Sequence, residues 1–270
     1  MVEVERILSK PLIGWMIILV NMLKYIGKIF LKYYLGLITK IVLVVHRPII
    51  IAVAGSINKA FVKEEVKKAL EERKYSVRAN PKNFNTEIGL PLAVLSLPSG
   101  YNSFRDWIPA ILKAPRKIFL RRFPKYLVLS IGTSDPGDAS YLLKIIKPKI
   151  LILTEISQRY LESFKDMDEL AKEYEMMRDI LTEDDLIIAN FDNSRIREIL
   201  VESKARVLGF GFFEKSDFKL IKIEKQYAGQ SFVYEYKNNQ INKNIKRFGK
   251  HHVYASLVKE AIIKYVEKKL

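Results

Sequence analysis

Cysteine is absent from this 270-residue sequence, and histidine occurs only three times. Without cysteine the chain forms no disulfide bond, no thiolate metal site and no cysteine nucleophile. A metal site made of imidazole groups would require His46, His251 and His252 to converge in space. We therefore predict no metal site built from these two residue types.

Acidic residues are also few, with 30 Asp and Glu against 46 Lys and Arg and a formal net charge of +16. Such an excess of positive charge favours anionic partners, which include an acidic membrane surface, a nucleotide or a nucleic acid. The sequence carries no helix-turn-helix pattern, no RNA-binding aromatic motif and no zinc-finger spacing. A nucleic acid is therefore the least favoured of the three partners.

Charge is missing altogether from Pro11 to Leu23, inside an apolar N-terminal segment. Lys24, Lys28 and Lys32 then follow at intervals of four residues, which places them on one face of a helix. The uncharged run is shorter than the roughly 20 residues that a helix needs to cross a bilayer core. We favour an amphipathic helix lying in the membrane interface, while a spanning helix and a helix packed on the protein itself stay open.

Two regions follow from this pattern, a membrane-associating segment at residues 1–48 and one domain at residues 49–270. The segment is expected to bind an anionic membrane surface, and the basic residues after the apolar run place the domain at the cytoplasmic face of the cell membrane. A cleaved signal peptide is disfavoured because Glu3 and Glu5 lie among the first ten residues.

Short apolar runs alternate with amphipathic helical patterns from residue 49 to about residue 210. This alternation predicts an α/β protein with a mostly parallel sheet flanked by helices. Two later stretches alternate polar and apolar residues around Ala228-Gly229, which predicts a small antiparallel β extension. The predicted strands are 49–54, 75–79, 125–131, 149–156, 185–189, 206–210, 219–224 and 231–236, and the predicted helices after the N-terminal segment are 59–74, one within 83–97, 104–122, 137–147, 167–181 and 251–269.

The first of these strands ends at Gly55, and Lys59 opens the helix that follows. A loop between a strand and a helix directs backbone N–H groups at one point, where an anion is favoured. Gly55, Ser56, Asn58 and Lys59 are therefore candidate phosphate-binding residues of an ATP site. The phosphate-loop pattern is incomplete, because Ala60 stands where a hydroxyl would hold Mg²⁺. A plain turn with a surface lysine is the alternative.

Beyond that helix, Asn83-Phe-Asn-Thr-Glu-Ile-Gly-Leu-Pro91 resembles the N-x-N-N-x-I-G-x-P segment of the Mur ligases. The resemblance is strongest to the branch that adds D-alanyl-D-alanine to peptidoglycan precursors. Four more blocks follow in the family's order: Gly132 with Pro136-Gly-Asp138, Thr154 with Leu161-Glu162, Asn190-Phe-Asp192, and Gly249-Lys-His251. The similar part runs from about residue 48 to residue 270, and it corresponds to the family's central, P-loop-like ATP-binding domain.

Mur ligases phosphorylate a carboxylate with ATP and then let an amine attack the acyl phosphate, so the resemblance implies ATP and Mg²⁺ as cofactors. It also implies that Asp192 and His251 contact the nucleotide and that Asn83, Asn85 and Thr86 belong to a substrate segment. The two asparagines can equally serve as helix caps.

Several positions that bind metal or adenine in the family carry other residues here. The magnesium-binding glutamate of the family falls on Ser130, and its carbamylated lysine falls on Tyr174. A metal-binding histidine falls on Tyr160, a nearby glutamate on Met176, and two adenine-holding asparagines on His252 and Ala255. No metal ligand is therefore predicted.

These departures lead to a first hypothesis, a membrane-held and catalytically degenerate Mur-ligase-like protein that serves as a scaffold or regulator of other cell-wall synthesis proteins. Residual nucleotide binding is compatible with it. The alternative is an active ATP-dependent ligase that adds D-alanyl-D-alanine or another amine to a UDP-muramoyl peptide. That activity would need a partner supplying the missing domain, or a rearranged metal site drawn from the carboxylates Asp135, Asp138, Glu155 and Glu162.

Overall fold

The computed structural model describes residues 2–81, 83–101, 104–159 and 161–269, and a nine-stranded sheet lies at its centre. The strands are β1 (Ile49–Ala54), β2 (Val77–Ala79), β3 (Tyr126–Ser130), β4 (Ile150–Leu153), β5 (Leu186–Asn190), β6 (Arg206–Gly211), β7 (Phe218–Gln226), β8 (Gly229–Tyr236) and β9 (Asn239–Ile245). The helices are α1 (Val2–His46), α2 (Lys59–Glu72), α3 (Gly89–Leu95), α4 (Phe104–Lys113), α5 (Asp138–Leu143), α6 (Met167–Asp179), α7 (Ser194–Ile199) and α8 (Lys250–Lys269), with 3-10 turns η1 (Pro115–Phe119) and η2 (Leu161–Ser163). Across the sheet the strands run in the order β2-β3-β1-β4-β5-β6-β7-β8-β9.

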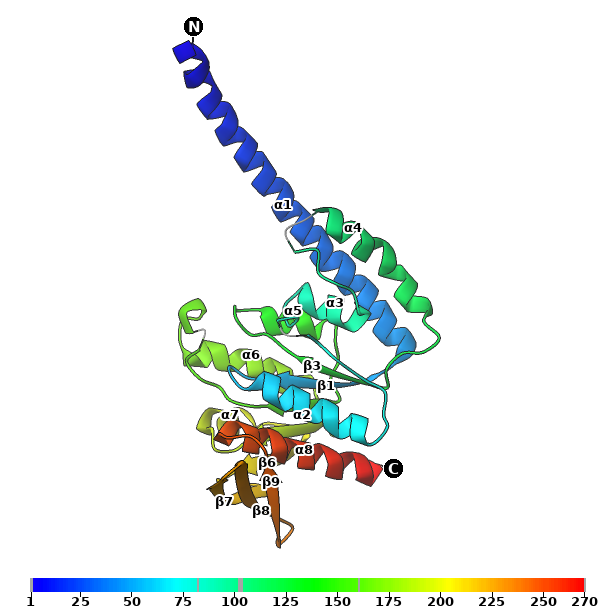
Figure 1. The fold of residues 1–270 in the computed structure, drawn as a ribbon, viewed down its shortest axis with the longest axis vertical. Helices are drawn as coiled ribbons and strands as arrows, with labels where there is room; N and C mark the ends of the chain where they lie inside the picture. Colours follow the sequence, from blue (N-terminus) through cyan, green and yellow to red (C-terminus); the bar gives the residue numbers. More distant parts are fainter. Residues whose placement is uncertain (1, 82, 102–103, 160, 270) are drawn as a thin grey trace.

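The parallel part of the sheet, from β2 to β7, lies between two layers of helices (Figure 1). Ile50 and Ala52 of β1 pack in a cluster with residues of α5, α6 and α7, whereas Ile51 and Val53 pack with α2 and α8. Strands buried on both faces need apolar side chains at every position, which explains the continuous apolar runs of the sequence. The predicted fold class, with its antiparallel extension of β7, β8 and β9, is confirmed.

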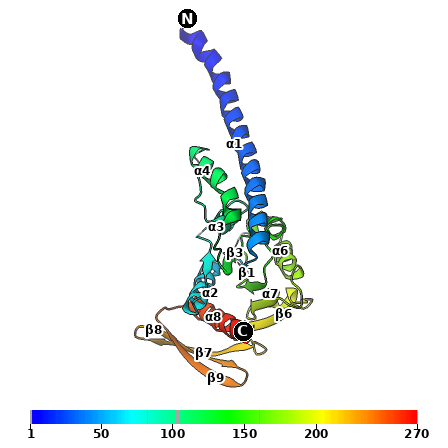
Figure 2. The same ribbon diagram turned by 90° about the vertical axis from the view of Figure 1, so that its right-hand side faces the viewer.

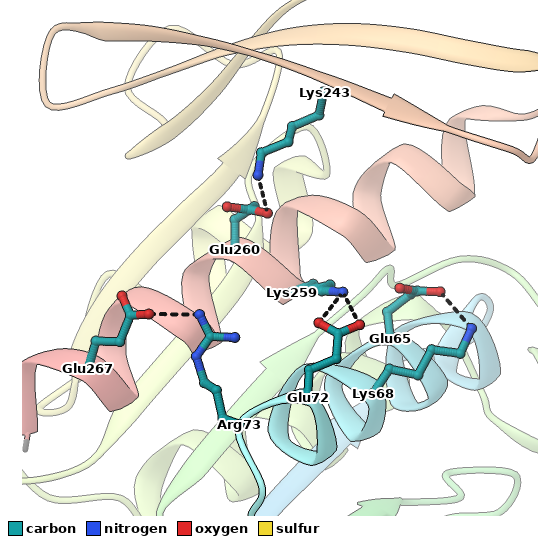
Figure 3. Close-up of polar contacts among 8 residues, drawn as sticks. All are labelled: Glu65, Lys68, Glu72, Arg73, Lys243, Lys259, Glu260 and Glu267. Atoms are coloured by element: carbon teal, nitrogen blue, oxygen red, sulfur yellow. Dashed lines mark hydrogen bonds and ion pairs between the residues drawn. The ribbon is translucent and has the colours of Figure 1, made fainter.

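Helices α2 and α8 lie side by side on one face of the sheet (Figures 1 and 3). Two ion pairs join their solvent-facing sides, Lys259 with Glu72 at 2.8 Å and Arg73 with Glu267 at 2.7 Å (Figure 3). Exposed pairs of this kind contribute at most about 1 kcal/mol each, so apolar packing supplies most of the attachment. The packing fixes the position at which α8 begins.

Helix α1 projects from the body, and only its C-terminal part packs on it (Figures 1 and 2). Leu35, Thr39 and Val42 are fully buried, and the two aliphatic side chains form a third core cluster with residues of α3 and α4. The stretch Ile18–His46 is long and apolar enough to cross a membrane, a criterion that core helices and signal sequences also meet. The predicted helix is present, and its relation to a membrane stays a prediction.

Several elements differ from the sequence-based expectation. The helix predicted at residues 137–147 ends at Leu143, and the strand predicted at residues 149–156 ends at Leu153. The helix predicted to reach residue 122 ends at Lys113, because Pro115 follows and the chain continues as the η1 turn. Helix α7 was not predicted; it has only six residues and begins where the Asn193 side chain accepts from the Ile196 N–H. Strand β9 was also not predicted, since it is rich in asparagine, which is depleted in strands. Backbone pairing with β8 holds this segment in the sheet, although its own sequence does not favour a strand.

Candidate functional site

The turn after β1 is fixed by its backbone conformation and by contacts with the segment that follows β4. Gly55 has φ +140°, and a Cβ placed on it would lie 2.1 Å from the Thr154 hydroxyl oxygen, so only glycine fits. The Ser56 N–H donates to the Glu155 carbonyl at 2.7 Å, and the Thr154 hydroxyl donates to the Ile57 carbonyl at 2.7 Å. We call residues 55–59 the 55–59 loop.

Asn58 and Lys59 set the start of α2. Asn58 has φ +67°, in the left-handed region that asparagine tolerates better than most residues other than glycine. In the complete phosphate-loop pattern a glycine precedes the lysine, and asparagine is one of the few other residues that adopt the left-handed conformation readily. The Asn58 side chain makes no capping hydrogen bond to α2. The N–H groups of the first helical turn are thus left to other acceptors, and such a helix start favours an anion.

The Lys59 ammonium group folds back over the loop and donates to the Gly55 carbonyl. Burial, and to a smaller extent the positive charge of Arg159, lowers the pKa of Lys59 from 10.5 to about 8. A phosphate group nearby would raise this pKa again, because an opposite charge favours the protonated form. Lys59 is therefore a partly desolvated cation that gains from an anionic ligand.

A cavity of about 460 Å³ lies beside the loop, and we call it the loop cavity. Its walls come from the turn after β1, the ends of β4 and β5, and the start of α8. The C-terminal ends of parallel strands meet at one edge of a sheet, where ligands of open α/β folds bind. The lining residues are Ile57, Asn58, Glu155, Asn190, Asp192, Asn193, Lys250, His251 and Tyr254.

Asp192 is held firmly in the wall of the loop cavity. Its carboxylate accepts from the Tyr254 hydroxyl and from the Phe213 N–H at 2.8 Å, and the Lys250 ammonium lies 3.4 Å away. Burial by itself raises the pKa of Asp192, but these hydrogen bonds and the charge of Lys250 outweigh it and keep the pKa below its ordinary value. Asp192 is therefore an ionised acceptor in a fixed orientation.

Glu155 and His251 complete the polar part of the cavity wall. Burial raises the pKa of Glu155, and the positive charge of Lys250 partly opposes the rise. The His251 ring packs against the Phe61 ring of α2 at 4.6 Å and against the His252 ring at 4.3 Å between centroids. The cavity thus combines carboxylates, an ammonium group and an immobilised aromatic ring, a mixture suited to a ligand with polar and aromatic parts.

Hydroxyl groups occupy two positions, Ser130 and Tyr174, that the family resemblance assigns to metal ligands. The Tyr174 side chain is fully buried, and its hydroxyl lies 2.9 Å from the Thr133 hydroxyl and 3.5 Å from that of Ser56. The Ser130 N–H donates to the Asn80 side-chain carbonyl at 2.9 Å, and the Asn80 amide donates back to the Ser130 hydroxyl at 2.9 Å. These groups are neutral and already paired. We call Ser56, Thr133 and Tyr174 the hydroxyl cluster.

The residues of the loop cavity offer Mg²⁺ at most two carboxylates, Glu155 and Asp192. Mg²⁺ is usually bound by one or two carboxylates together with phosphate oxygens and water. In the part of the chain that the structure describes, no three His, Cys, Asp or Glu side chains gather closely enough to hold a metal ion. Glu155 lines the loop cavity, whereas Asp138 accepts from the N–H groups of Ser134 and Asp135 in its own turn.

The predicted substrate segment lies at the end of β3. The Asn85 carbonyl accepts from the Gly132 N–H at 2.9 Å, and the Thr86 hydroxyl accepts from the Gly89 N–H at 3.2 Å in the first turn of α3. Asn83 has φ +65°, and with Thr86 it lines a separate cavity of about 270 Å³. The side-chain bond to α3 is therefore made by Thr86 and not by an asparagine cap, and a substrate-binding role for the segment stays a prediction.

The structure brings part of the predicted nucleotide site together. Asn58, Asp192 and His251 share the loop cavity, and Gly55, Ser56 and Lys59 belong to the adjoining loop. Tyr160 lies outside the described residues, and Met176 packs at the edge of the main core. Sequence reasoning missed Tyr254. It lies three residues after His251, and residues so spaced share a helix face, which is the signal that could have found it.

Comparison with known proteins shows the same relationship over most of the chain. Residues 110–262 match the model of the Mur ligase middle domain. The UDP-N-acetylmuramoyl-tripeptide--D-alanyl-D-alanine ligase of Rickettsia prowazekii is 26% identical over 194 residues, which are 70% of this chain and 38% of that relative. This chain therefore spans well under half of the length of that protein.

Solved structures give the same fold. MurF from Acinetobacter baumannii superimposes with a TM-score of 0.70 and 18% sequence identity, over 87% of this chain and 47% of that one. The MurF ligase from Thermotoga maritima, solved in complex with ADP, gives a TM-score of 0.70 at 19% identity, over 87% of this chain and 49% of that one. At such identities the likeness is one of fold, and it includes the predicted P-loop-like central domain.

Proposed function

Since this chain belongs to the Mur ligase family by its middle domain, we propose that it binds ATP in the loop cavity and serves amide-bond ligation in peptidoglycan-precursor synthesis. The 55–59 loop would hold the phosphates through the N–H groups at the start of α2 and the Lys59 ammonium. His251 and Asp192 would contact the base and ribose side of the nucleotide. ATP supplies the phosphoryl group that activates a carboxylate in this kind of ligation.

One observation carries the proposal. Asn58 stands where the complete phosphate-loop pattern has its second glycine, and it adopts the left-handed conformation at φ +67° directly before the half-buried Lys59. This combination supports a phosphate-binding role for the loop. The ADP complex of the Thermotoga maritima relative supports a nucleotide at the corresponding domain.

For the catalytic state we propose an active ligase, in which this chain supplies the nucleotide-binding part. The curated relatives with the strongest matches are all named as ligases of UDP-N-acetylmuramoyl compounds, which favours this version. We assign no step to Mg²⁺, because no cluster of three metal-ligating side chains is found among the described residues. Glu155 and Asp192 are the carboxylates that line the loop cavity.

A degenerate scaffold is the second candidate, and the hydroxyl cluster favours it. Tyr174 is fully buried and hydrogen-bonded where the resemblance places a metal-bridging lysine. Loss of one preorganised group that stabilises charge in the transition state commonly lowers the rate by a factor on the order of 100 to 1000. In this version ATP still binds, but no amide bond forms.

A ligation assay separates the two versions. The full chain is incubated with ATP, Mg²⁺, a UDP-muramoyl tripeptide and D-alanyl-D-alanine, and phosphate release and peptide product are measured, with a Lys59→Ala variant as the control. ATP-dependent product that the variant does not form supports the active ligase. Bound ATP without product supports the scaffold, and the absence of both contradicts the proposed function.

We further propose that α1 holds the protein at the cytoplasmic face of the cell membrane. Ile18, Leu23 and Phe30 are each at least half exposed, although a water-soluble helix normally buries such residues. Flotation with vesicles of anionic phospholipid tests the attachment. We expect the full chain to float and to stay bound in part at high salt, because salt screens lysines but not apolar burial. A chain that remains at the bottom of the gradient contradicts the attachment.

A further inference from the structure

Apolar side chains continue from α1 onto α4, the helix beside it. In α4, Ile108 and Leu112 are 55% and 65% exposed, and in α1 the neighbouring Phe30 is 56% exposed. The Tyr34 hydroxyl of α1 donates to the Ile111 carbonyl of α4 at 2.9 Å, which ties the two helices together. Both views show α1 and α4 on the same end of the molecule, away from the β7–β9 extension (Figures 1 and 2).

A groove of about 640 Å³ runs between these two helices, and we call it the α1–α4 groove. Its walls are mainly apolar and aromatic: Gly27, Phe30 and Leu31 from α1, and Trp107, Ile108 and Ile111 from α4. Glycine at position 27 leaves one wall without a side chain. The shape and lining suit a flexible hydrocarbon chain more than a polar metabolite.

Positive charge lies on the same groove. Lys24 and Lys28 belong to its lining, and Lys28 forms an ion pair with Glu87 at 3.2 Å. Both lysine side chains are exposed, so an anionic headgroup can approach them from outside the groove. Exposed Lys113, Arg116 and Arg121 continue the positive surface from the end of α4 toward the body.

We propose that the α1–α4 groove binds one anionic phospholipid, with an acyl chain against Trp107 and Ile108 and the headgroup phosphate at Lys24 and Lys28. This site is more specific than attachment of α1 to a membrane, because it names a single lipid with a defined headgroup charge. Charge complementarity selects the anionic headgroup, and the apolar walls select the chain. The site is separate from the loop cavity and stands whether or not ATP binds.

Trp107 provides a direct probe, since the chain contains only one other tryptophan, Trp15. In a Trp15→Phe background, the full chain in a non-ionic detergent is titrated with phosphatidylglycerol brominated in the middle of its acyl chains. Bromine quenches tryptophan emission on contact. We expect saturable loss of at least half of the emission, and native mass spectrometry should show one lipid per chain.

The headgroup is tested with phosphatidylcholine carrying the same brominated chains. We expect it to require at least about tenfold more lipid for half-saturation, since each lysine near an anionic headgroup contributes roughly fivefold in affinity. Changing both groove lysines, Lys24→Gln with Lys28→Gln, should remove most of this preference. The matched control removes the same charge elsewhere, with Lys40→Gln and Lys147→Gln at exposed positions, and should leave the preference unchanged.

Two further variants test the groove itself. Gly27→Phe fills it and should abolish the saturable quenching, whereas Leu37→Phe adds the same ring to an exposed face of α1 and should have no effect. Ile108→Glu is a second variant for the case that Gly27→Phe alters folding. The Ile108 side chain is more than half exposed, so the fold should tolerate the change. Quenching that rises linearly without saturation, or that persists unchanged in Gly27→Phe and Ile108→Glu, overturns the proposal.

Discussion

The loop cavity and the hydroxyl cluster both adjoin the 55–59 loop, and they differ from the family pattern in different ways. At the cavity, Asn58 stands where the complete pattern has a glycine, and its backbone takes the left-handed conformation. In the hydroxyl cluster, Tyr174 stands where the resemblance places a charged metal ligand, and its buried hydroxyl is hydrogen-bonded to Thr133. The comparison teaches that a site which works through backbone N–H groups tolerates side-chain substitution, whereas a site which works through carboxylates does not.

Gly55→Ala should have the largest effect on stability, because it disrupts the backbone conformation of the 55–59 loop. A Cβ at this position would lie 2.1 Å from Thr154 and would sit at φ +140°. Strain and overlap together should lower the free energy of unfolding by about 3 kcal/mol or more. Gly137→Ala is the matched control. Gly137 also has a positive φ, +89°, but nothing lies within 4 Å, so urea denaturation should show a loss of only about 1 kcal/mol.

Lys59→Ala should remove the ammonium group from the 55–59 loop and leave the loop backbone in place. We expect ATP affinity to fall by a factor on the order of 100, which is the weight of one hydrogen bond to a charged group. The melting temperature should not fall, since burial of the ammonium group without an anion is itself unfavourable. Lys67→Ala on the same helix removes an equal charge next to Glu71 and should leave ATP affinity as it was. Equal affinities of the two variants would refute the role of Lys59.

Tyr174→Phe tests whether the hydroxyl cluster contributes to stability without contributing to nucleotide binding. The change removes the partner of the Thr133 hydroxyl, while Ser56 keeps its hydrogen bonds to Ser157, and it should cost about 1 kcal/mol in the free energy of unfolding. ATP affinity should change by less than about threefold, because the proposed nucleotide site is the loop cavity, whose lining does not include Tyr174. A double-mutant cycle with Thr133→Val should show that the two losses are not additive. A large loss of ATP affinity in Tyr174→Phe would mean that the hydroxyl cluster belongs to the nucleotide site.

The smallest expected effect is one of pH. The pKa of Lys59 is about 8 in the folded chain and 10.5 in the unfolded one, so between these values only the unfolded chain holds the proton. Lys59 should therefore make the folded state more stable as pH rises from about 8 to 10.5. ATP affinity should move in the opposite direction and fall above pH 8, because the neutral amine attracts phosphate less. The fall should be absent in Lys59→Ala, and an identical pH profile in both proteins would contradict this.

Much of the fold was predictable because the parallel strands are apolar at nearly every position. Ile49–Ala54 and Leu186–Asn190 are buried along almost their whole length, so short continuous runs marked them. Strand β9 could not be predicted in this way, because its half-exposed edge position places few demands on its side chains. Helix α4 is shorter than its sequence pattern predicts, because Pro115 begins the η1 turn soon after Lys113.

The candidate site was predictable where the backbone decides it and less so where tertiary contacts do. Gly55 and Lys59 were recognisable from their spacing at the start of a helix. The hydrogen bond between Tyr174 and Thr133 was not predictable, because it joins two segments far apart in sequence. The α1–α4 groove was not predictable at all, since it exists only where two distant helices lie together.

Calorimetric titration of ATP into the full chain tests most directly whether the 55–59 loop holds a nucleotide. We predict saturable heat with one ATP per chain, competition by ADP, and loss of the signal in Lys59→Ala while Lys67→Ala retains it. Absence of binding by the parent chain at millimolar ATP, or equal binding by parent and Lys59→Ala, would contradict a nucleotide site at this loop.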